Sequence, residues 1–149
     1  MRYAPFKGVI VELDMNKNFK GHTFFLNRSV NSKKIKINRG VYENIELESV
    51  DFMEKYEVFS TDQIEARYLL TTGLIERIEN IKLSFNSNYI RSAFKDNKLY
   101  IAIDTGRDMF AMGNDFKKSD FETFRTLFQE IISLMKLIEQ FNLDSKSGL

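Results

Sequence analysis

The residues closest to a catalytic motif are Asp104, Thr105 and Gly106, which follow an apolar stretch. An Asp-Thr-Gly turn after a strand resembles the catalytic turn of aspartic proteases, in which two aspartates share one proton. This chain has one copy, so it would have to dimerise, and Arg107 stands where those proteases have a small residue. The sequence therefore predicts a strand that ends in an Asx turn, and a hydrolase using Asp104 is an alternative hypothesis.

Other common catalytic chemistries have little support in the sequence. The chain has one histidine, His22, and no cysteine, so zinc sites, iron–sulfur clusters and thiol nucleophiles lack their usual residues. The glycine-rich phosphate and dinucleotide motifs and the nucleophile-elbow motif of serine hydrolases are absent. Asp104, Asp108 and Asp115 do not have the spacing of a calcium loop. We expect no cofactor, no metal site, and a structural or surface role for His22.

One segment of the chain is basic and contains no acid. Its cations are Arg28, Lys33, Lys34, Lys36 and Arg39. They could contact phosphates or anionic lipid headgroups, which makes a lipid- or nucleic-acid-contacting module a further alternative. The net charge is only +1, so no strong nucleic-acid signal is present. We expect this segment to be a mobile loop that tolerates substitution, and we expect the acidic segment that follows it, 43–62, to neutralise it.

Length and composition predict a single soluble domain over residues 1–149. The chain is 43% hydrophobic and 29% charged, which is typical of a globular protein of this size. Fourteen phenylalanines and no tryptophan indicate a core of rings that need no hydrogen-bond partner. The sequence contains neither a signal peptide nor an apolar stretch long enough to span a membrane.

The spacing of apolar residues predicts an α+β fold, with a mainly antiparallel sheet and helices packed on it. The clearest hairpin joins 89–95 to 98–104 through Asp96 and Asn97, which tolerate left-handed turn geometry. A polar link between 6–15 and 23–27 suits a second hairpin. The expected strands are 6–15, 23–27, 45–49, 56–59, 89–95 and 98–104, with a further short strand as an option at 108–112.

Capping signals mark the helices that follow a short helical segment at 50–55. Asp62, with Glu65 three residues later, resembles a capping box for a helix that ends near Leu70. Thr71 is the expected cap of a second helix. Leu74, Ile78, Ile81 and Phe85 recur in that helix at helical spacing.

The C-terminal segment has the strongest helix signal in the chain. Ser119 and Glu122 form a capping box, and a wide apolar stripe follows at Phe121, Phe124, Phe128, Ile131, Met135 and Ile138. We expect a long C-terminal helix that lies against the sheet as part of the core. On this reading, Phe128→Ala costs about 3–5 kcal/mol of stability. A coiled-coil seam is the alternative, although no orderly flanking charge pairs support it.

Several segments carry a family resemblance. Phe6-Lys7-Gly8-Val9-Ile10 and Ala66-Arg67-Tyr68 are two of its motifs, and the matching segments are 6–10, 14–23, 47–52, 56–71 and 92–103. Together they resemble a bacterial family catalogued as a domain of unknown function, numbered thirty-one thirty-seven. The resemblance implies a small membrane-anchored protein with apolar helices upstream of this region, on the cytoplasmic side. It implies no activity and no catalytic residues, and Thr72 departs from the usual proline.

The leading hypothesis is a non-enzymatic binding or scaffold domain at a membrane, which recognises another protein or a small ligand. Candidate interaction residues are Arg67, Tyr68, Lys33, Lys34 and Lys36. For Ala66-Arg67-Tyr68 a structural role is also open, in which the alanine allows close helix packing and Arg67 pairs with Glu57 or Glu65. The sequence leaves the ligand and the oligomeric state open.

Overall fold

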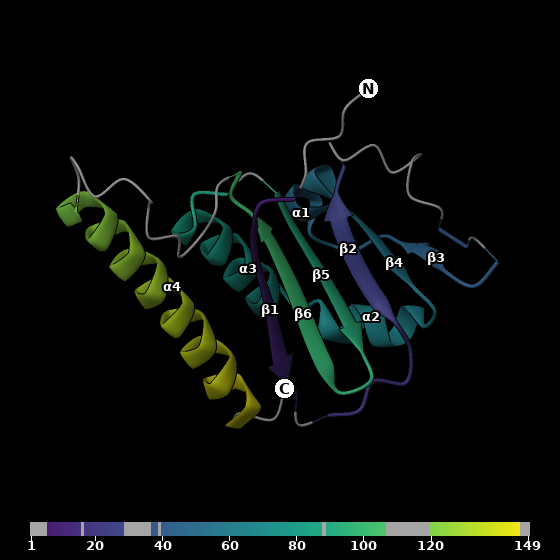
Figure 1. Cartoon of the computed structure of the whole chain (residues 1–149). Coiled ribbons are helices and arrows are strands. Elements are labelled where there is room, and N and C mark those ends of the chain that lie inside the picture. Colours follow the sequence, from purple (N-terminus) through teal and green to yellow (C-terminus); the bar gives the residue numbers. More distant parts are fainter. Residues whose placement is uncertain are drawn as a thin grey trace.

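A six-stranded antiparallel sheet forms the centre of the molecule (Figure 1). The structure, a computed structural model, describes residues 6–15, 17–28, 37, 38, 40–87, 89–106 and 120–146. The strand order is β1-β6-β5-β2-β4-β3. The strands are β1 (Gly8–Asp14), β2 (Thr23–Asn27), β3 (Glu43–Ile45), β4 (Tyr56–Ser60), β5 (Tyr89–Lys95) and β6 (Lys98–Asp104). The fold is therefore α+β, as the sequence predicts.

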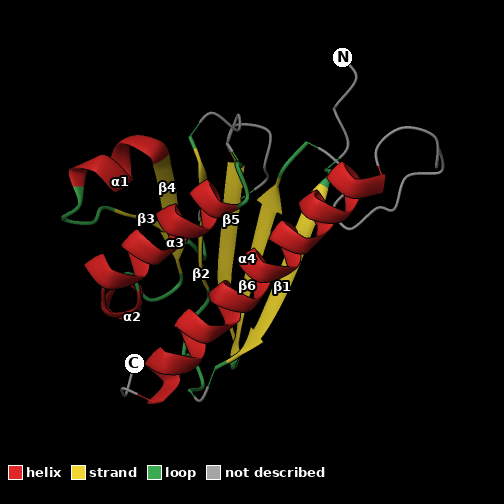
Figure 2. Cartoon of the chain, turned by 90° about the vertical axis from the view of Figure 1, so that its left-hand side faces the viewer, coloured by secondary structure: helices red, strands yellow, loops and turns green. Residues whose placement is uncertain are grey.

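Three short helices cover one face of this sheet. They are α1 (Val50–Lys55), α2 (Gln63–Leu69) and α3 (Thr72–Ser84). Figure 2 shows them on one side of the strands. The remaining helix, α4 (Asp120–Lys146), runs beside α3. An antiparallel sheet with one covered face needs apolar residues at alternate positions, and its strands have them.

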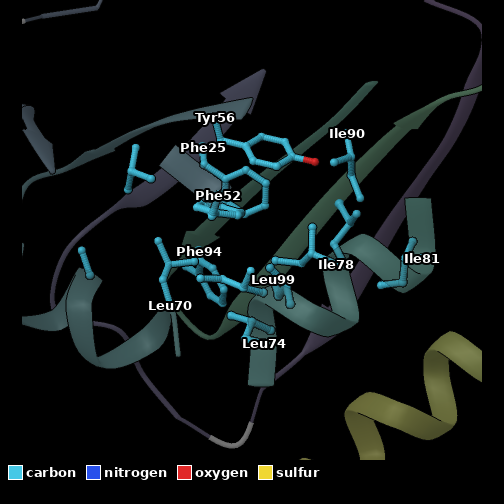
Figure 3. Close-up of a cluster of buried hydrophobic side chains, with 14 of the residues drawn as sticks. Phe25, Phe52, Tyr56, Leu70, Leu74, Ile78, Ile81, Ile90, Phe94 and Leu99 are labelled. Atoms are coloured by element: carbon cyan, nitrogen blue, oxygen red, sulfur yellow. The ribbon is translucent and has the colours of Figure 1, made fainter. Parts of the chain in front are cut away.

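The core lies between the covered face of the sheet and these three helices (Figure 3). Each strand contributes to it, and in β6 the residues at alternate positions, Leu99, Ile101 and Ile103, are all buried. Helix α3 contributes Ile78 and Ile81, at helical spacing. Phenylalanine rings fill the centre, as the composition predicts. No described side chain of α4 belongs to this cluster.

The capping predictions for α2 and α3 are confirmed in part. Asp62 Oδ1 accepts hydrogen bonds from the backbone N–H groups of Ile64 and Glu65, both at 3.0 Å. Thr71 Oγ1 accepts from Leu74 N at 3.3 Å. The reciprocal half of the capping box is wrong, because Asp62 N donates to Ser60 Oγ and not to Glu65. The carboxylate of Glu65 is thereby free to bind elsewhere.

The predicted hairpin between β1 and β2 is wrong, whereas the hairpin of β5 and β6 is confirmed. The link after β1 runs past the β5–β6 turn, where Met15 N donates to Asn97 O and Phe19 N donates to Asp96 O. Phe19 is buried and packs edge-on against Phe94. These contacts carry the chain across the end of the hairpin, so β5 and β6 lie between β1 and β2.

Two other predicted elements differ from the structure. Strand β3 ends at Ile45, so the strand expected over 45–49 is displaced toward the N-terminus. Ser49 instead precedes α1 as its N-cap residue. The helical segment 50–55 and strand 56–59 are confirmed as α1 and β4, the latter with one extra residue. The optional strand at 108–112 lies outside the described residues.

The predicted packing of a long C-terminal helix on the sheet is wrong. The side chains expected to be buried are exposed: Phe124 by 59%, Phe128 by 65% and Met135 by 57%. Glu130, on the other side of the helix, is 7% exposed. Successive residues of a helix are rotated by about 100° around its axis. The side of α4 that carries Glu130 is buried, so the side that carries these apolar residues faces outward. The described hydrophobic core is therefore formed by the sheet and the three short helices.

A partly buried polar network connects the strands to α3. Tyr56, which is fully buried, donates its hydroxyl hydrogen to Glu79 Oε1 at 3.0 Å. The second oxygen of Glu79 lies 3.4 Å from Lys55 Nζ. Beside Tyr56, the side chain of Asn27 accepts the backbone N–H of Ile90 at 2.9 Å. Burial, together with the Glu79 carboxylate, raises the pKa of Tyr56 above its usual range. The tyrosine therefore acts as a hydrogen-bond donor in the folded protein.

Candidate functional site

A pocket of about 650 Å³ opens between β3, α1 and α2. Its lining mixes two arginines, two glutamates and apolar side chains: Arg28, Asn44, Glu46, Leu47, Val50, Met53, Glu54 and Arg67. Its two cations and two carboxylates balance in charge. The pocket therefore offers no strong attraction for an anion or for a cation.

The side chain of Arg28 is held in place by contacts within the domain. Its Nε donates to the carbonyl oxygen of Met53, and its Nη1 lies 3.6 Å from Glu57 Oε1. This ion pair joins the basic segment to the acidic segment, as predicted. Arg28 is the one cation of the basic segment among the described residues. Lys33, Lys34, Lys36 and Arg39 lie outside the described residues, and so does most of the predicted loop. Arg28 thus serves as a wall of the pocket.

Arg67 and Tyr68, the candidate interaction residues on α2, point to different surroundings. Arg67 lines the pocket. Tyr68 lies beside the link between β1 and β2, where Lys17 Nζ is 4.2 Å from the centre of its ring. The prediction that Arg67 pairs with Glu57 or Glu65 is wrong, because Glu57 binds Arg28 and Glu65 binds backbone. The two residues therefore do not form one site.

The sequence reading missed a clamp made by Glu65. Its Oε1 accepts the N–H of Lys20 at 2.8 Å, and its Oε2 accepts the N–H of Gly21 at 2.7 Å. Beside it, Thr61 Oγ1 accepts the N–H of His22 at 2.9 Å. The clamp holds the β1–β2 link against the start of α2. A side chain at position 21 would collide with it, since an added Cβ would lie 2.7 Å from Thr61 Oγ1.

We expect Glu65→Ala to lower the free energy of unfolding by about 1–2 kcal/mol, because two backbone N–H groups lose a charged acceptor. Urea denaturation followed by circular dichroism measures the change. The matched control is Glu76→Ala, which removes an exposed carboxylate from α3 and should change stability by less than about 0.5 kcal/mol. Equal effects of the two substitutions would show that the clamp does not stabilise the fold.

The largest group of exposed apolar side chains lies on α4. It is called here the α4 stripe and consists of Phe121, Phe124, Phe128, Ile131 and Met135. Successive members are three, four, three and four residues apart, which places them on one side of a helix. The least exposed member, Ile131, still shows 40% of its surface. Monomeric proteins rarely expose so many large apolar groups together, so the stripe is a candidate interaction surface.

Comparison with known proteins gives one match. Residues 4–143 match the family model DUF3137, described as a protein of unknown function. The chain belongs to the DUF3137 family. This confirms the resemblance drawn from the sequence and extends it across almost the whole chain. No curated protein and no solved structure matches the DUF3137 chain.

In this DUF3137 domain, Asp104 stabilises its own turn. Its Oδ1 accepts the N–H of Gly106 at 3.1 Å, and the same N–H group lies 3.0 Å from the carbonyl oxygen of Lys7. Gly106 has a φ of +70°, which suits glycine. The predicted Asx turn is therefore confirmed.

The described part of the DUF3137 domain carries neither a metal-site nor a membrane-span pattern. No group of three or more His, Cys, Asp or Glu side chains there could hold a metal ion. No helix of these residues is both long and apolar enough to cross a membrane. His22 lies next to Tyr42, with Nδ1 and the hydroxyl oxygen 3.3 Å apart.

Proposed function

We propose that this DUF3137 domain is a protein-binding module that docks through the α4 stripe, with segment 120–146 acting as one long helix. The exposure of the stripe supports the proposal above all. With about 200 Å² for each fully exposed large side chain, its five members offer about 600 Å² of apolar surface per chain. This is at the upper end of the range of about 300–600 Å² for the largest apolar patch of a typical monomer. Covering it with a protein partner would remove that surface from water.

The charge of the helix favours a protein partner over a lipid surface. Segment 120–146 contains five acidic and three basic residues. Helices that lie on membranes usually carry Lys and Arg on the polar side, because anionic headgroups attract them. A net negative helix is repelled by such a surface. We therefore place the domain beside a membrane, as the family resemblance implies, but assign its helix to a protein.

A photo-crosslinking experiment tests this proposal. The chain has no cysteine, so Gln129→Cys creates a single attachment point for a benzophenone on the exposed side of α4. Irradiation in the native cells should give protein adducts, and adding Phe128→Glu should remove most of them. The control position is Arg91→Cys, an exposed residue on β5 in the interior of the sheet.

Two outcomes would contradict the protein-binding function. One is equal crosslinking from positions 129 and 91, or adducts that persist with Phe128→Glu. The other is flotation of the purified domain with phosphatidylglycerol vesicles, abolished by Phe128→Glu, which would assign the stripe to lipid. Absence of flotation with phosphatidylglycerol vesicles, together with adducts specific to position 129, supports the proposal.

A further inference from the structure

We infer that the occupant of the α4 stripe is the stripe of a second copy of this chain, in an antiparallel pair. The inference rests on the proposed function and names its partner. Members of the stripe follow the three-and-four spacing of a two-stranded coiled coil over two heptads. A symmetric pair with a two-fold axis uses the same surface on both copies. The α4 stripe can form such a pair if it is complementary to the same stripe on a second copy.

The two halves of the stripe complement each other in size. The N-terminal half holds rings, at Phe121, Phe124 and Phe128, whereas the C-terminal half holds the aliphatic Ile131 and Met135. An antiparallel pair centred between residues 129 and 130 places Phe128 opposite the partner's Ile131 and Phe124 opposite the partner's Met135. The two layers formed by these four positions then each contain one ring and one aliphatic chain. A parallel pair would instead stack rings on rings at one end, so uniform packing favours the antiparallel pair.

The area and the placement of α4 fit such a pair. Two copies of the stripe would bury about 1,200 Å² together, above the roughly 1,000 Å² expected of a specific interface. The opposite side of the helix is already occupied, because Glu130 is buried and makes an interaction there. Figure 2 shows α4 at the outside of the domain, where a second molecule can approach it. The helix thus presents its apolar side to a partner and its other side to its own domain.

Sedimentation equilibrium of the purified chain tests the pairing. We expect a dimer at micromolar concentration, and Phe128→Glu should raise the dissociation constant at least about 100-fold, because it buries a charge on both copies. The matched control is Ile10→Glu, which places the same charge at an exposed apolar position of β1. The control should leave the dimer intact. Circular dichroism verifies that both variants remain folded.

Disulfide formation tests the orientation. A mixture of Phe128→Cys and Ile131→Cys chains should form mixed disulfide dimers, because these positions face each other in the antiparallel pair. Each variant alone should crosslink poorly. Efficient crosslinking of Phe128→Cys with itself would show a parallel pair and overturn the inference.

A chain that is monomeric at all concentrations would also overturn the inference. The crosslinking experiment then shows separately whether the proposed function still stands. If the chain is monomeric but Gln129→Cys still crosslinks to a different protein, self-pairing fails and protein docking stands. If the chain is monomeric and position 129 gives no specific adduct, both fail. A dimer that Phe128→Glu leaves intact would place the interface elsewhere.

Discussion

Phe25→Ala should lower the free energy of unfolding by about 3–5 kcal/mol. Phe25 is 1% exposed on the central strand β2, and its ring packs edge-on against Phe52 and Tyr56, with ring centres 5.4 and 5.3 Å away. Alanine leaves a cavity between β2, β4 and α1, and the surrounding elements are tied by the sheet, so they can close it only in part. Urea denaturation at a protein concentration below the dissociation constant of any dimer measures the loss in the monomer.

The matched control for this prediction is Phe128→Ala. It makes the same chemical change on the α4 stripe, where the ring is exposed, and should alter the stability of the sheet by less than about 0.5 kcal/mol. The sequence alone predicts a large cost for Phe128→Ala. A large cost for Phe128→Ala in the monomer would show that α4 packs into the core, and the proposed docking surface would then be wrong.

Tyr56→Phe should cost about 1–2 kcal/mol at neutral pH, because the ring stays in place while the hydrogen bond to Glu79 is lost. The cost should also depend on pH. An unfolded tyrosine loses its proton near pH 10, whereas burial and Glu79 raise the pKa of Tyr56 in the folded state. The unfolded state alone is then deprotonated above about pH 10. Wild-type stability should therefore fall there by about 1.4 kcal/mol per pH unit through this group.

The difference in stability between wild type and Tyr56→Phe isolates this effect from other titrating groups. We expect the difference to be constant from pH 7 to 9 and to shrink above about pH 10. Guanidinium denaturation at each pH provides the values. A difference that stays constant up to pH 11 would mean that the pKa of Tyr56 is the same in the folded and unfolded states. Burial and Glu79 would then not raise it.

Local signals in the sequence predicted most of the elements. The β5–β6 hairpin depends on two adjacent turn residues, and Asp96 has the left-handed φ of 58° that such a turn requires. The caps of α2 and α3 depend on Asp62 and Thr71, which bind N–H groups two or three residues away. Because the residues that determine each turn or cap lie within a few positions of it, these features can be predicted without knowing the tertiary structure.

Features that depend on distant parts of the chain could not be predicted. The position of β1 beside β6 follows from contacts between Phe19 and the β5–β6 turn, more than seventy residues away. Glu65 has the spacing of a capping box but binds the link at Lys20 and Gly21. The α4 stripe indicated a surface that needs covering, yet helical spacing does not specify whether the domain itself or a partner covers it. Of the candidate residues, Arg67 lines a pocket and Tyr68 contacts Lys17, and neither lies on this stripe.

The rate of maleimide labelling of Phe124→Cys tests the central claim most directly. The chain contains no cysteine, so the introduced thiol on the α4 stripe is the single target. In the dilute purified domain this thiol should react as fast as Ile10→Cys, an exposed control on β1. In intact cells we expect labelling of Phe124→Cys to slow by at least about tenfold, in proportion to a docked fraction above about 90%, with Ile10→Cys unchanged. Equally fast labelling of both positions in cells would contradict a docking surface on α4.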